Sequence, residues 1–184
     1  MMYLIDHSFG GASLLTSLIT IIYNAIIFIL PAYIANATPT IFGGGTPLDL
    51  GKKLPDGRRI FGDHKTIRGL ISGIICGTLT GILIPFLDSN ISLYQSIIRA
   101  CLLSIGTHVG DLFGSFIKRR LDLKPGQSAP VLDQLGFLVF ALLITYPFYP
   151  IGIYEILFLV ILTAIAHPIT NLIAYILGIK DRPY

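Results

Sequence analysis

Charged side chains are scarce in this sequence. Of its 184 residues, 12% are Asp, Glu, Lys or Arg and 53% are hydrophobic, and the mean hydropathy is +0.77. Soluble domains average about 25% charged and about 45–50% apolar residues, so this composition excludes an ordinary soluble domain. The 13 Lys and Arg residues cluster between apolar segments and form no extended basic face, which argues against nucleic acid as a partner. A membrane protein accounts for both features.

Cysteine is nearly absent, and the N-terminus lacks the features of a signal peptide. Cys76 and Cys101 both lie in apolar runs, so they predict neither a disulfide framework nor a metal site. No Lys or Arg precedes the first apolar run, and the run has no small-residue cleavage pattern. We therefore expect this run to be a retained membrane span.

Long uncharged runs indicate the membrane spans. A helix needs about 20 residues to cross the roughly 30 Å apolar core of a bilayer. Four uncharged runs are suitable, and a further apolar segment carries Arg99, His108 and Asp111. The sequence predicts an all-α polytopic protein with one membrane domain, residues 1–184, and five transmembrane helices at about 13–35, 69–87, 91–115, 134–150 and 154–178.

Basic residues are confined to every second connection between these spans. They occur in two polar loops, at about 37–68 and 116–133, and in the C-terminal tail, whereas the other three flanks contain no Lys or Arg. By the positive-inside rule, the two polar loops and the C-terminus are cytoplasmic and the N-terminus is outside. We expect a multi-pass protein of the plasma membrane whose active site faces the cytoplasm.

Glycine recurs at helical spacing in two of the expected spans. The glycines are four residues apart within each span: Gly69, Gly73, Gly77 and Gly81, then Gly106, Gly110 and Gly114. Small residues at this spacing let helix backbones approach closely, which predicts tight packing within the bundle or in a homodimer. A groove in which a ligand lies against the backbone is the alternative.

Three residues interrupt the last apolar run: His167, Pro168 and Asn171. The proline removes a backbone donor and predicts a kink. His167 and Asn171 lie one turn apart, so they either satisfy the freed carbonyls or have a direct functional role. The sequence does not choose between these two roles.

One carboxylate, Asp111, lies near the cytoplasmic end of an expected span. A carboxylate at the centre of a transmembrane helix costs on the order of 2.5–3.5 kcal/mol, so this one should face protein, water or a cation. At about 100° per residue, one helix face carries His108, Asp111, Ser115, Lys118 and Asp122. This face is either part of an active site or an interfacial ladder of salt bridges with Lys118.

The first polar loop is rich in glycine and basic residues. Its run at 43–53 is not a phosphate-binding P-loop, because the glycine spacing is one residue too long and no Ser or Thr follows Lys52. Further on, Lys65, Thr66 and Arg68 lead into an uncharged run, where a helix N-terminus with free N–H groups would favour an anion. Ordinary positive-inside flanking is the alternative.

The two polar loops together resemble the CTP-dependent phosphatidate cytidylyltransferases. The second loop is similar to their motif in Gly110-Asp111-Leu112, Ser115, Lys118-Arg119, Pro125-Gly126 and Leu132-Asp133. Lys65-Thr66 with Gly69 resembles a second element of that superfamily. The whole chain looks most like the archaeal branch, the CDP-archaeol synthases, in its short length, its five spans and the first-loop pattern Pro39-Thr40, Gly43-Gly44-Gly45, Pro47-Leu48-Asp49 and Gly62-Asp63-His64-Lys65-Thr66.

Departures from the bacterial pattern bear on the lipid substrate. Ser128-Ala129-Pro130 replaces His-Gly-Gly, and Gln134 stands where Arg is usual. The resemblance therefore implies an isoprenoid ether lipid and not a diacyl lipid. The implied reaction transfers CMP from CTP to the phosphate of 2,3-bis-O-(geranylgeranyl)-sn-glycerol 1-phosphate and releases pyrophosphate, a step of ether-lipid biosynthesis.

The same resemblance implies roles for particular residues. Asp111 and Asp133 would bind Mg²⁺, with a second cation such as K⁺ left open, and Lys65 would act with them in catalysis. Contacts with the nucleotide and its phosphates are expected from Asn36, Thr66, Arg68, Ser115, Lys118 and Arg119. Further candidates are Asp49, Asp63, His64, His108 and Lys124.

Two other functions remain open on the sequence. A CTP-dependent polyprenol or dolichol kinase would share much of the chemistry but would release CDP in place of pyrophosphate. A small transporter would carry an ion or metabolite past Asp111 and His167, although such a protein has little need of the polar loops. An enzyme with a lipid substrate needs a lateral opening between spans, and the glycine stripe at 69–81 is a candidate for part of its wall.

Overall fold

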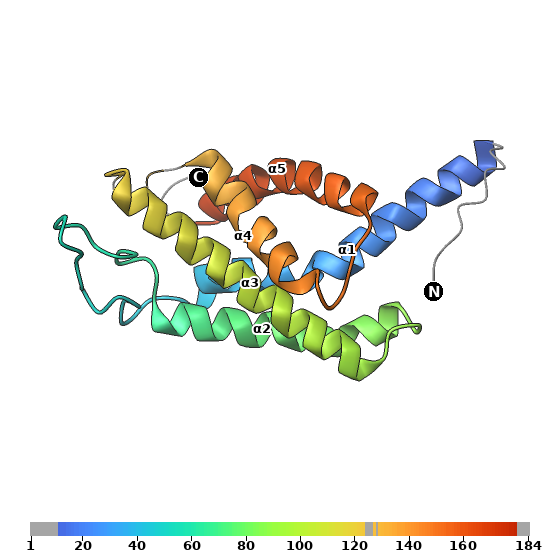
Figure 1. The fold of residues 1–184 in the computed structure, drawn as a ribbon, viewed down its shortest axis with the longest axis horizontal. Coiled ribbons are helices and arrows are strands. Elements are labelled where there is room, and N and C mark those ends of the chain that lie inside the picture. Colours follow the sequence, from blue (N-terminus) through green and yellow to red (C-terminus); the bar gives the residue numbers. More distant parts are fainter. Residues whose placement is uncertain (1–10, 124–126, 128, 180–184) are drawn as a thin grey trace.

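The computed structural model describes residues 11–123, 127 and 129–179. These residues form five helices: α1 Gly11–Phe42, α2 Ile67–Leu87, α3 Leu93–Arg120, α4 Pro130–Thr145 and α5 Ile153–Ile176. The helices make an elongated bundle, and successive connections alternate between its two ends (Figure 1). The all-helical prediction is confirmed.

Two helices extend past their predicted ends. Helix α1, predicted at 13–35, continues to Phe42, so its last turns are helical and not part of the loop. It ends before Gly43, where an added Cβ would overlap a carbonyl of the preceding turn, so this stop requires glycine. Helix α3, predicted at 91–115, continues to Arg120, which brings Lys118, Arg119 and Arg120 of the second polar loop onto the helix.

Helix α4 is shifted and shorter than expected. It was predicted at 134–150 but begins at Pro130, where a missing N–H costs no hydrogen bond, and ends at Thr145, shortly before Pro147. Its 16 residues span about 24 Å, less than the roughly 30 Å apolar core. Within the described residues, four helices are long and apolar enough to cross a membrane, and α4 is a shorter apolar helix. The five predicted spans therefore correspond to four candidate spans and one shorter helix.

The glycine stripe of α2 mediates helix packing. A Cβ added at Gly73 would overlap the ring of His108 on α3 and lie 2.8 Å from the Ala35 carbonyl oxygen on α1. A Cβ at Gly77 would lie 2.8 Å from the Pro31 carbonyl oxygen. Helix α2 is therefore held between α1 and α3 at backbone contact distance, which confirms the predicted tight packing. The expectation that this stripe lines an opening for lipid is wrong, because protein already covers it.

Helices α4 and α5 complete the bundle. A Cβ at Gly110 of α3 would lie 2.8 Å from the Cα of Phe137 on α4, so glycine also sets this helix distance. The hydroxyls of Tyr33 on α1 and Thr163 on α5 share a hydrogen bond of 2.7 Å, and the His167 ring stacks on Phe137. The buried apolar core consists of Ala25, Phe28, Ile29, Ala32, Leu103, Phe137, Leu138, Ala141 and Leu159.

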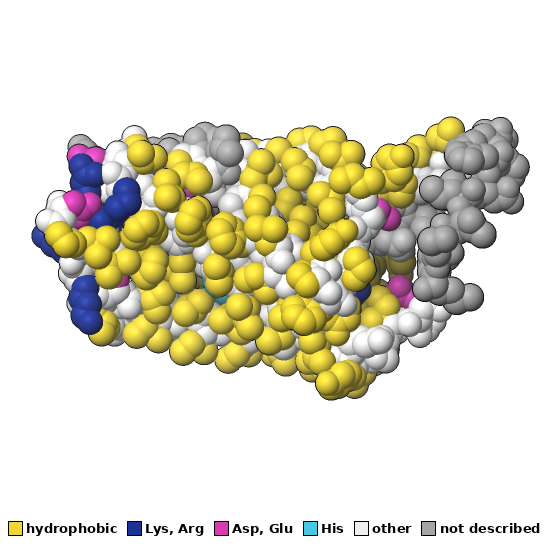
Figure 2. All heavy atoms as spheres, in the orientation of Figure 1, with side chains coloured by type: hydrophobic (Ala, Val, Ile, Leu, Met, Phe, Trp, Pro, Cys, Tyr) yellow, Lys and Arg dark blue, Asp and Glu magenta, His cyan; other side chains and the backbone are white. Residues whose placement is uncertain are grey.

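The surface separates apolar and charged side chains along the bundle. Figure 2 shows hydrophobic side chains along the length of one face, with Lys and Arg gathered at one end. That end carries the connection between α1 and α2 and the C-terminal end of α3 (Figure 1). Because a continuous apolar surface is unfavourable in water, the bundle has the surface of a multi-pass membrane protein with a polar end.

Candidate active site

The connection between α1 and α2 folds into a compact segment, residues 43–66, which we call the loop hairpin. Pro47 and Thr66 form an antiparallel bridge at its base. Beside them, the Leu48 N–H donates a hydrogen bond of 2.7 Å to the Lys65 carbonyl. The backbone of Lys65 is therefore fixed immediately before α2.

The N-terminus of α2 is not the open anion site that the sequence suggests. The N–H of Gly69 donates to the Thr66 hydroxyl at 3.1 Å, and the N–H of Ile67 donates to a hairpin carbonyl at 3.1 Å. The Arg68 guanidinium donates to two carbonyls at the end of α1, one of them at 2.7 Å. Thr66 therefore caps α2, and Arg68 ties the first turn of α2 to the end of α1, so the backbone N–H groups of Ile67 and Gly69 are already bonded.

Asp49 organises the loop hairpin from within. Its side chain is fully buried and accepts hydrogen bonds from the backbone N–H groups of Gly51, Phe61 and Gly62 at 2.9–3.2 Å and from the Arg59 guanidinium. Burial alone would raise the pKa of Asp49, but the hydrogen bonds from Arg59 and these N–H groups outweigh it and hold the pKa well below its usual value. The pKa of Arg59 is raised in return. All of these partners belong to the hairpin itself.

The loop hairpin is docked on the C-terminal end of α3 by a second set of charges. Arg120 donates to the Asp56 carboxylate at 2.7 Å and to the Arg59 carbonyl. Arg58 donates to the Arg120 carbonyl and forms an ion pair of 3.4 Å with Asp122, which lies beyond the helix and not on the predicted α3 face. Sequence reasoning missed these contacts, and alternating Arg and Asp residues in the two polar loops are the signal that could have suggested them.

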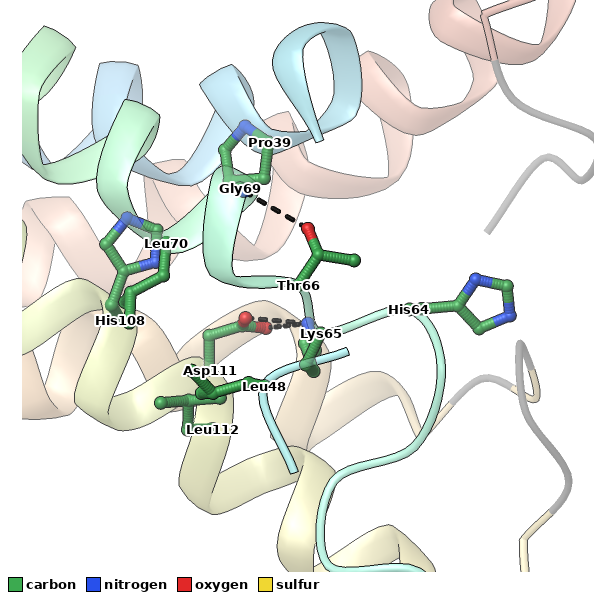
Figure 3. Close-up of a pocket in the computed structure, with 10 residues that line it drawn as sticks. All are labelled: Pro39, Leu48, His64, Lys65, Thr66, Gly69, Leu70, His108, Asp111 and Leu112. Carbon is green, nitrogen blue, oxygen red and sulfur yellow. Dashed lines mark hydrogen bonds and ion pairs between the residues drawn. The ribbon is translucent and has the colours of Figure 1, made fainter. Parts of the chain in front are cut away.

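The docked hairpin brings Lys65 to Asp111. The Lys65 ammonium donates to both carboxylate oxygens of Asp111 at 2.6 Å. The two side chains line a small pocket whose other walls include Thr66 and His108 (Figure 3). The predicted ladder between Asp111 and Lys118 is not formed, because Asp111 pairs with a residue 46 positions away in the sequence.

Lys118 instead pairs with Asp133. Its ammonium donates to one carboxylate oxygen at 2.6 Å, and the other oxygen accepts the Ala129 N–H at 2.8 Å, at the start of α4. Lys118 lies two turns after Asp111 on α3, so the second ion pair is about 10 Å further along that helix axis. Both predicted metal-binding carboxylates therefore lie at the hairpin end of the bundle, each paired with a lysine.

Other predicted site residues differ in how far they are buried. Ser115 and Arg119 are buried on the last turns of α3, and Arg119 lies against Gly62 of the hairpin. His108 is buried and lines the pocket, with its Nε2 atom unbonded among the described residues. Asn36 is half-buried on α1 and is not among the residues that line the pocket.

Among the described residues, the other candidates of the first polar loop are not bonded to Asp111. Asp63 is exposed and pairs with Arg59 at 2.7 Å. His64 borders the pocket, but Figure 3 shows its ring directed away from Asp111. Lys124 lies outside the described residues. On α5, Asn171 and the His167 ring share a hydrogen bond of 3.1 Å.

Comparison with known proteins places the fold and these residues in a family. The CarS-like family, described as CDP-archaeol synthase, matches residues 18–184. A CDP-archaeol synthase of Methanococcus aeolicus is 49% identical over 174 residues, covering 90% of this chain and 98% of the relative. One from Pyrococcus horikoshii is 52% identical over 159 residues, covering 85% and 94%.

A solved structure has the same fold. It is described as an intramembrane enzyme for archaeal membrane lipids biosynthesis, and it is 39% identical with a TM-score of 0.74, covering 80% of this chain and 92% of its own. The sequence and structural similarities agree over most of the chain. The protein therefore belongs to the CarS-like family of CDP-archaeol synthases.

Proposed function

We propose that this protein transfers CMP from CTP to the phosphate of 2,3-bis-O-(geranylgeranyl)-sn-glycerol 1-phosphate, giving CDP-activated unsaturated archaeol and pyrophosphate. Its relatives over most of the chain are named for CDP-archaeol synthesis. The observation that carries the proposal is the contact between Lys65 and Asp111, which joins one motif residue from the loop hairpin to another from α3. A site assembled from these two segments is suited to a reaction at the membrane surface.

The reaction requires little proton chemistry from the protein. A phosphate monoester has a second pKa of about 6 and is largely dianionic near neutral pH, so it can attack the α-phosphorus of CTP without a dedicated base. The protein must instead align two anionic substrates and balance the charge of the departing pyrophosphate. Lys65, Lys118 and Arg119 supply positive charge at the hairpin end, and Ser115 is buried one turn before Lys118 and Arg119 on α3. Asn36 remains the candidate for contacts with cytosine or ribose.

Asp111 and Asp133 are suited to bind Mg²⁺. Carboxylate oxygens are preferred ligands of this ion, which usually takes only one or two carboxylates together with water and substrate phosphates. The described residues contain no group of three or more His, Cys, Asp or Glu side chains that could enclose a metal. In this proposal water and the nucleotide phosphates supply the remaining ligands. When bound, Mg²⁺ would neutralise the phosphates and hold them in line. We leave open a second cation such as K⁺.

We place the hairpin end in the cytoplasm and the protein in the plasma membrane. Lys and Arg side chains gather at this end, which is the distribution that the positive-inside rule predicts for a cytoplasmic surface (Figure 2). CTP is available there. In this orientation α4 is the fifth membrane segment. Its 16 residues are fewer than the roughly 20 that a helix needs to cross the bilayer core. We leave open a homodimer contact through small residues of the membrane helices.

The reaction is tested with purified protein in detergent. The protein is given Mg²⁺, CTP and the geranylgeranyl ether-lipid phosphate, and both pyrophosphate and the CDP-lipid are measured, with diacyl phosphatidate as the competing substrate. We expect both products from the ether lipid and much less from the diacyl lipid. Release of CDP from CTP and an isoprenoid alcohol would establish the kinase alternative. Monodisperse protein that forms no product with either lipid would contradict the proposed enzyme.

A further inference from the structure

Both carboxylates proposed to bind metal already hold a cation. The Lys65 ammonium lies 2.6 Å from each oxygen of Asp111, on the edge of the carboxylate that a bidentate cation would use. The Lys118 ammonium lies 2.6 Å from one oxygen of Asp133. Each lysine therefore contacts carboxylate oxygens to which a metal ion would bind, and it neutralises the carboxylate.

The pocket at the first pair has no space for a nucleotide. Its cavity volume is about 40 Å³, enough for one or a few waters, whereas sites for small organic ligands are on the order of 300–1,000 Å³. Thr66 and His108 form its walls together with the ion pair (Figure 3). A triphosphate can reach Asp111 only if a side chain moves, and Lys65 is the side chain between Asp111 and the hairpin.

Both lysines can move without unfolding their surroundings. The backbone of Lys65 is fixed by the Leu48 hydrogen bond at the base of the hairpin, and Lys118 lies in the last turn of α3. Only the flexible side chains, each with four rotatable carbon bonds, need to turn. Neither ion pair is sealed, because the Asp111 and Asp133 side chains are 34% and 26% exposed.

We propose that Lys65 and Lys118 are place-holder cations, which leave Asp111 and Asp133 for the triphosphate when the nucleotide arrives with its divalent metal. This inference rests on the proposed function. Each lysine exchanges a carboxylate partner for a phosphate partner, so its charge stays compensated throughout. Metal alone must compete with an ammonium group and binds weakly, whereas metal and CTP together bind cooperatively. The exchange thus keeps the carboxylates neutralised until substrate is present.

The test measures metal binding without turnover. Mn²⁺ binding to the full-length protein in detergent is followed by electron paramagnetic resonance, with and without a non-hydrolysable CTP analogue. Without nucleotide, we expect Lys65→Met and Lys118→Met each to bind Mn²⁺ at least about tenfold more tightly than wild type, and to lose most of the gain that the analogue gives wild type. Lys65→Arg, which keeps a cation on Asp111, should bind Mn²⁺ no more tightly than wild type. Lys52→Met, at an exposed hairpin lysine, is the matched control and should change neither value.

Failure of this inference is distinguishable from failure of the metal assignment. If Asp111→Asn and Asp133→Asn weaken Mn²⁺ binding while neither Lys→Met variant strengthens it, the carboxylates bind metal and the place-holder role is wrong. If both Asp→Asn variants bind Mn²⁺ as wild type does, the proposed metal site itself is wrong. Thermal unfolding with and without Mn²⁺ verifies that each variant is folded. Lys65→Met and Lys118→Met should each gain more stability from Mn²⁺ than wild type gains.

Discussion

Asp49 in the loop hairpin and Asp111 on α3 lie in the same polar end of the molecule, but their carboxylates are held in different ways. Asp49 is fully buried and accepts three backbone N–H groups in addition to Arg59. Asp111 is one-third exposed and is held by the ammonium of Lys65. Backbone donors are fixed by the fold, whereas a lysine side chain can turn away.

This difference separates a structural carboxylate from one that is suited to exchange ligands. Losing Asp49 would leave several hydrogen-bond donors of the hairpin without an acceptor, so its replacement should act on folding. Losing Asp111 would free one flexible lysine, so its replacement should act on the reaction. Residue type and position in a loop motif do not distinguish the two, since both belong to the pattern that resembles the family.

The largest expected effect is the loss of turnover in Asp111→Asn. The amide is nearly isosteric but lacks the charge that holds a divalent metal, so we expect CDP-lipid formation to fall at least about 1,000-fold. The melting temperature should stay within a few degrees of wild type. Asp133→Asn is the companion variant and should behave alike. Near wild-type turnover at saturating Mg²⁺ in both variants would contradict the proposed metal-binding role of Asp111 and Asp133.

Asp49→Asn tests the structural role assigned to this carboxylate and should destabilise the loop hairpin. An amide at this buried position keeps one acceptor oxygen but places an NH₂ group against fixed N–H donors and Arg59, which costs about 2–3 kcal/mol. We expect the hairpin to open, which faster hydrogen exchange at residues 50–62 would report. Asp63→Asn, at the exposed partner of the same arginine, is the control and should leave exchange almost unchanged. Equal exchange in Asp49→Asn and wild type would contradict the assigned role.

Gly73→Ala tests the helix packing that supports Asp111. The added methyl would overlap the His108 ring and crowd α1, so we expect a loss of about 1–3 kcal/mol in the free energy of unfolding. Gly136→Ala is the matched control, because its Cβ would meet only the Gly110 carbonyl oxygen at 3.6 Å. Thermal unfolding in detergent measures both variants. If Gly73→Ala and Gly136→Ala were equally stable, the result would contradict the close contact between α2 and α3.

Acid should loosen the hairpin through Asp49. The folded state holds the pKa of this carboxyl below its ordinary value of 3.8, so ionised Asp49 stabilises the hairpin at pH values above about 4. This stability declines as the pH falls toward the lower folded pKa, with a loss of about 1 kcal/mol between pH 5 and pH 3. A spin label on a cysteine at the exposed position of Lys53 should become more mobile over this range. In Asp49→Asn the label should be mobile at both pH values.

The smallest expected effect belongs to His167→Ala on α5. The ring shares a hydrogen bond with Asn171 and stacks on Phe137. Its removal should cost less than about 1 kcal/mol of stability and change turnover by less than about threefold. Kinetics with the ether-lipid substrate measure the second quantity. A loss of 100-fold or more would show that the polar end is not the whole of the active site.

Much of the architecture was predictable from local features of the sequence. Long apolar runs gave the helices, because the hydrophobicity that favours a membrane span is a property of a continuous segment. Asp111 was identifiable as a candidate site residue from its position alone, since a carboxylate near a span has few stable environments. The ends of α4 were less accessible, because they depend on how Pro130 and Pro147 are used and not on hydrophobicity.

Partners in the polar end were not predictable in the same way. Lys118 is two helical turns from Asp111 and was the obvious partner, yet Asp111 pairs with Lys65, which comes from the hairpin. Arg68 donates to a carbonyl at the end of α1, and the Thr66 hydroxyl caps α2, and neither contact was predicted. These outcomes depend on contacts between distant segments, which are fixed only when glycine packing has brought α2 against α3.

The sequence by itself determined an all-helical membrane chain, its family resemblance and the set of carboxylates and lysines at its polar loops, because these follow from composition and from motifs written in continuous segments. The tertiary structure decided which carboxylate is buried as a support and which are paired with a movable lysine. This difference between the carboxylates arises from hydrogen bonds across the hairpin and from the packing of α2 against α3. Both depend on contacts between segments that are distant in the sequence.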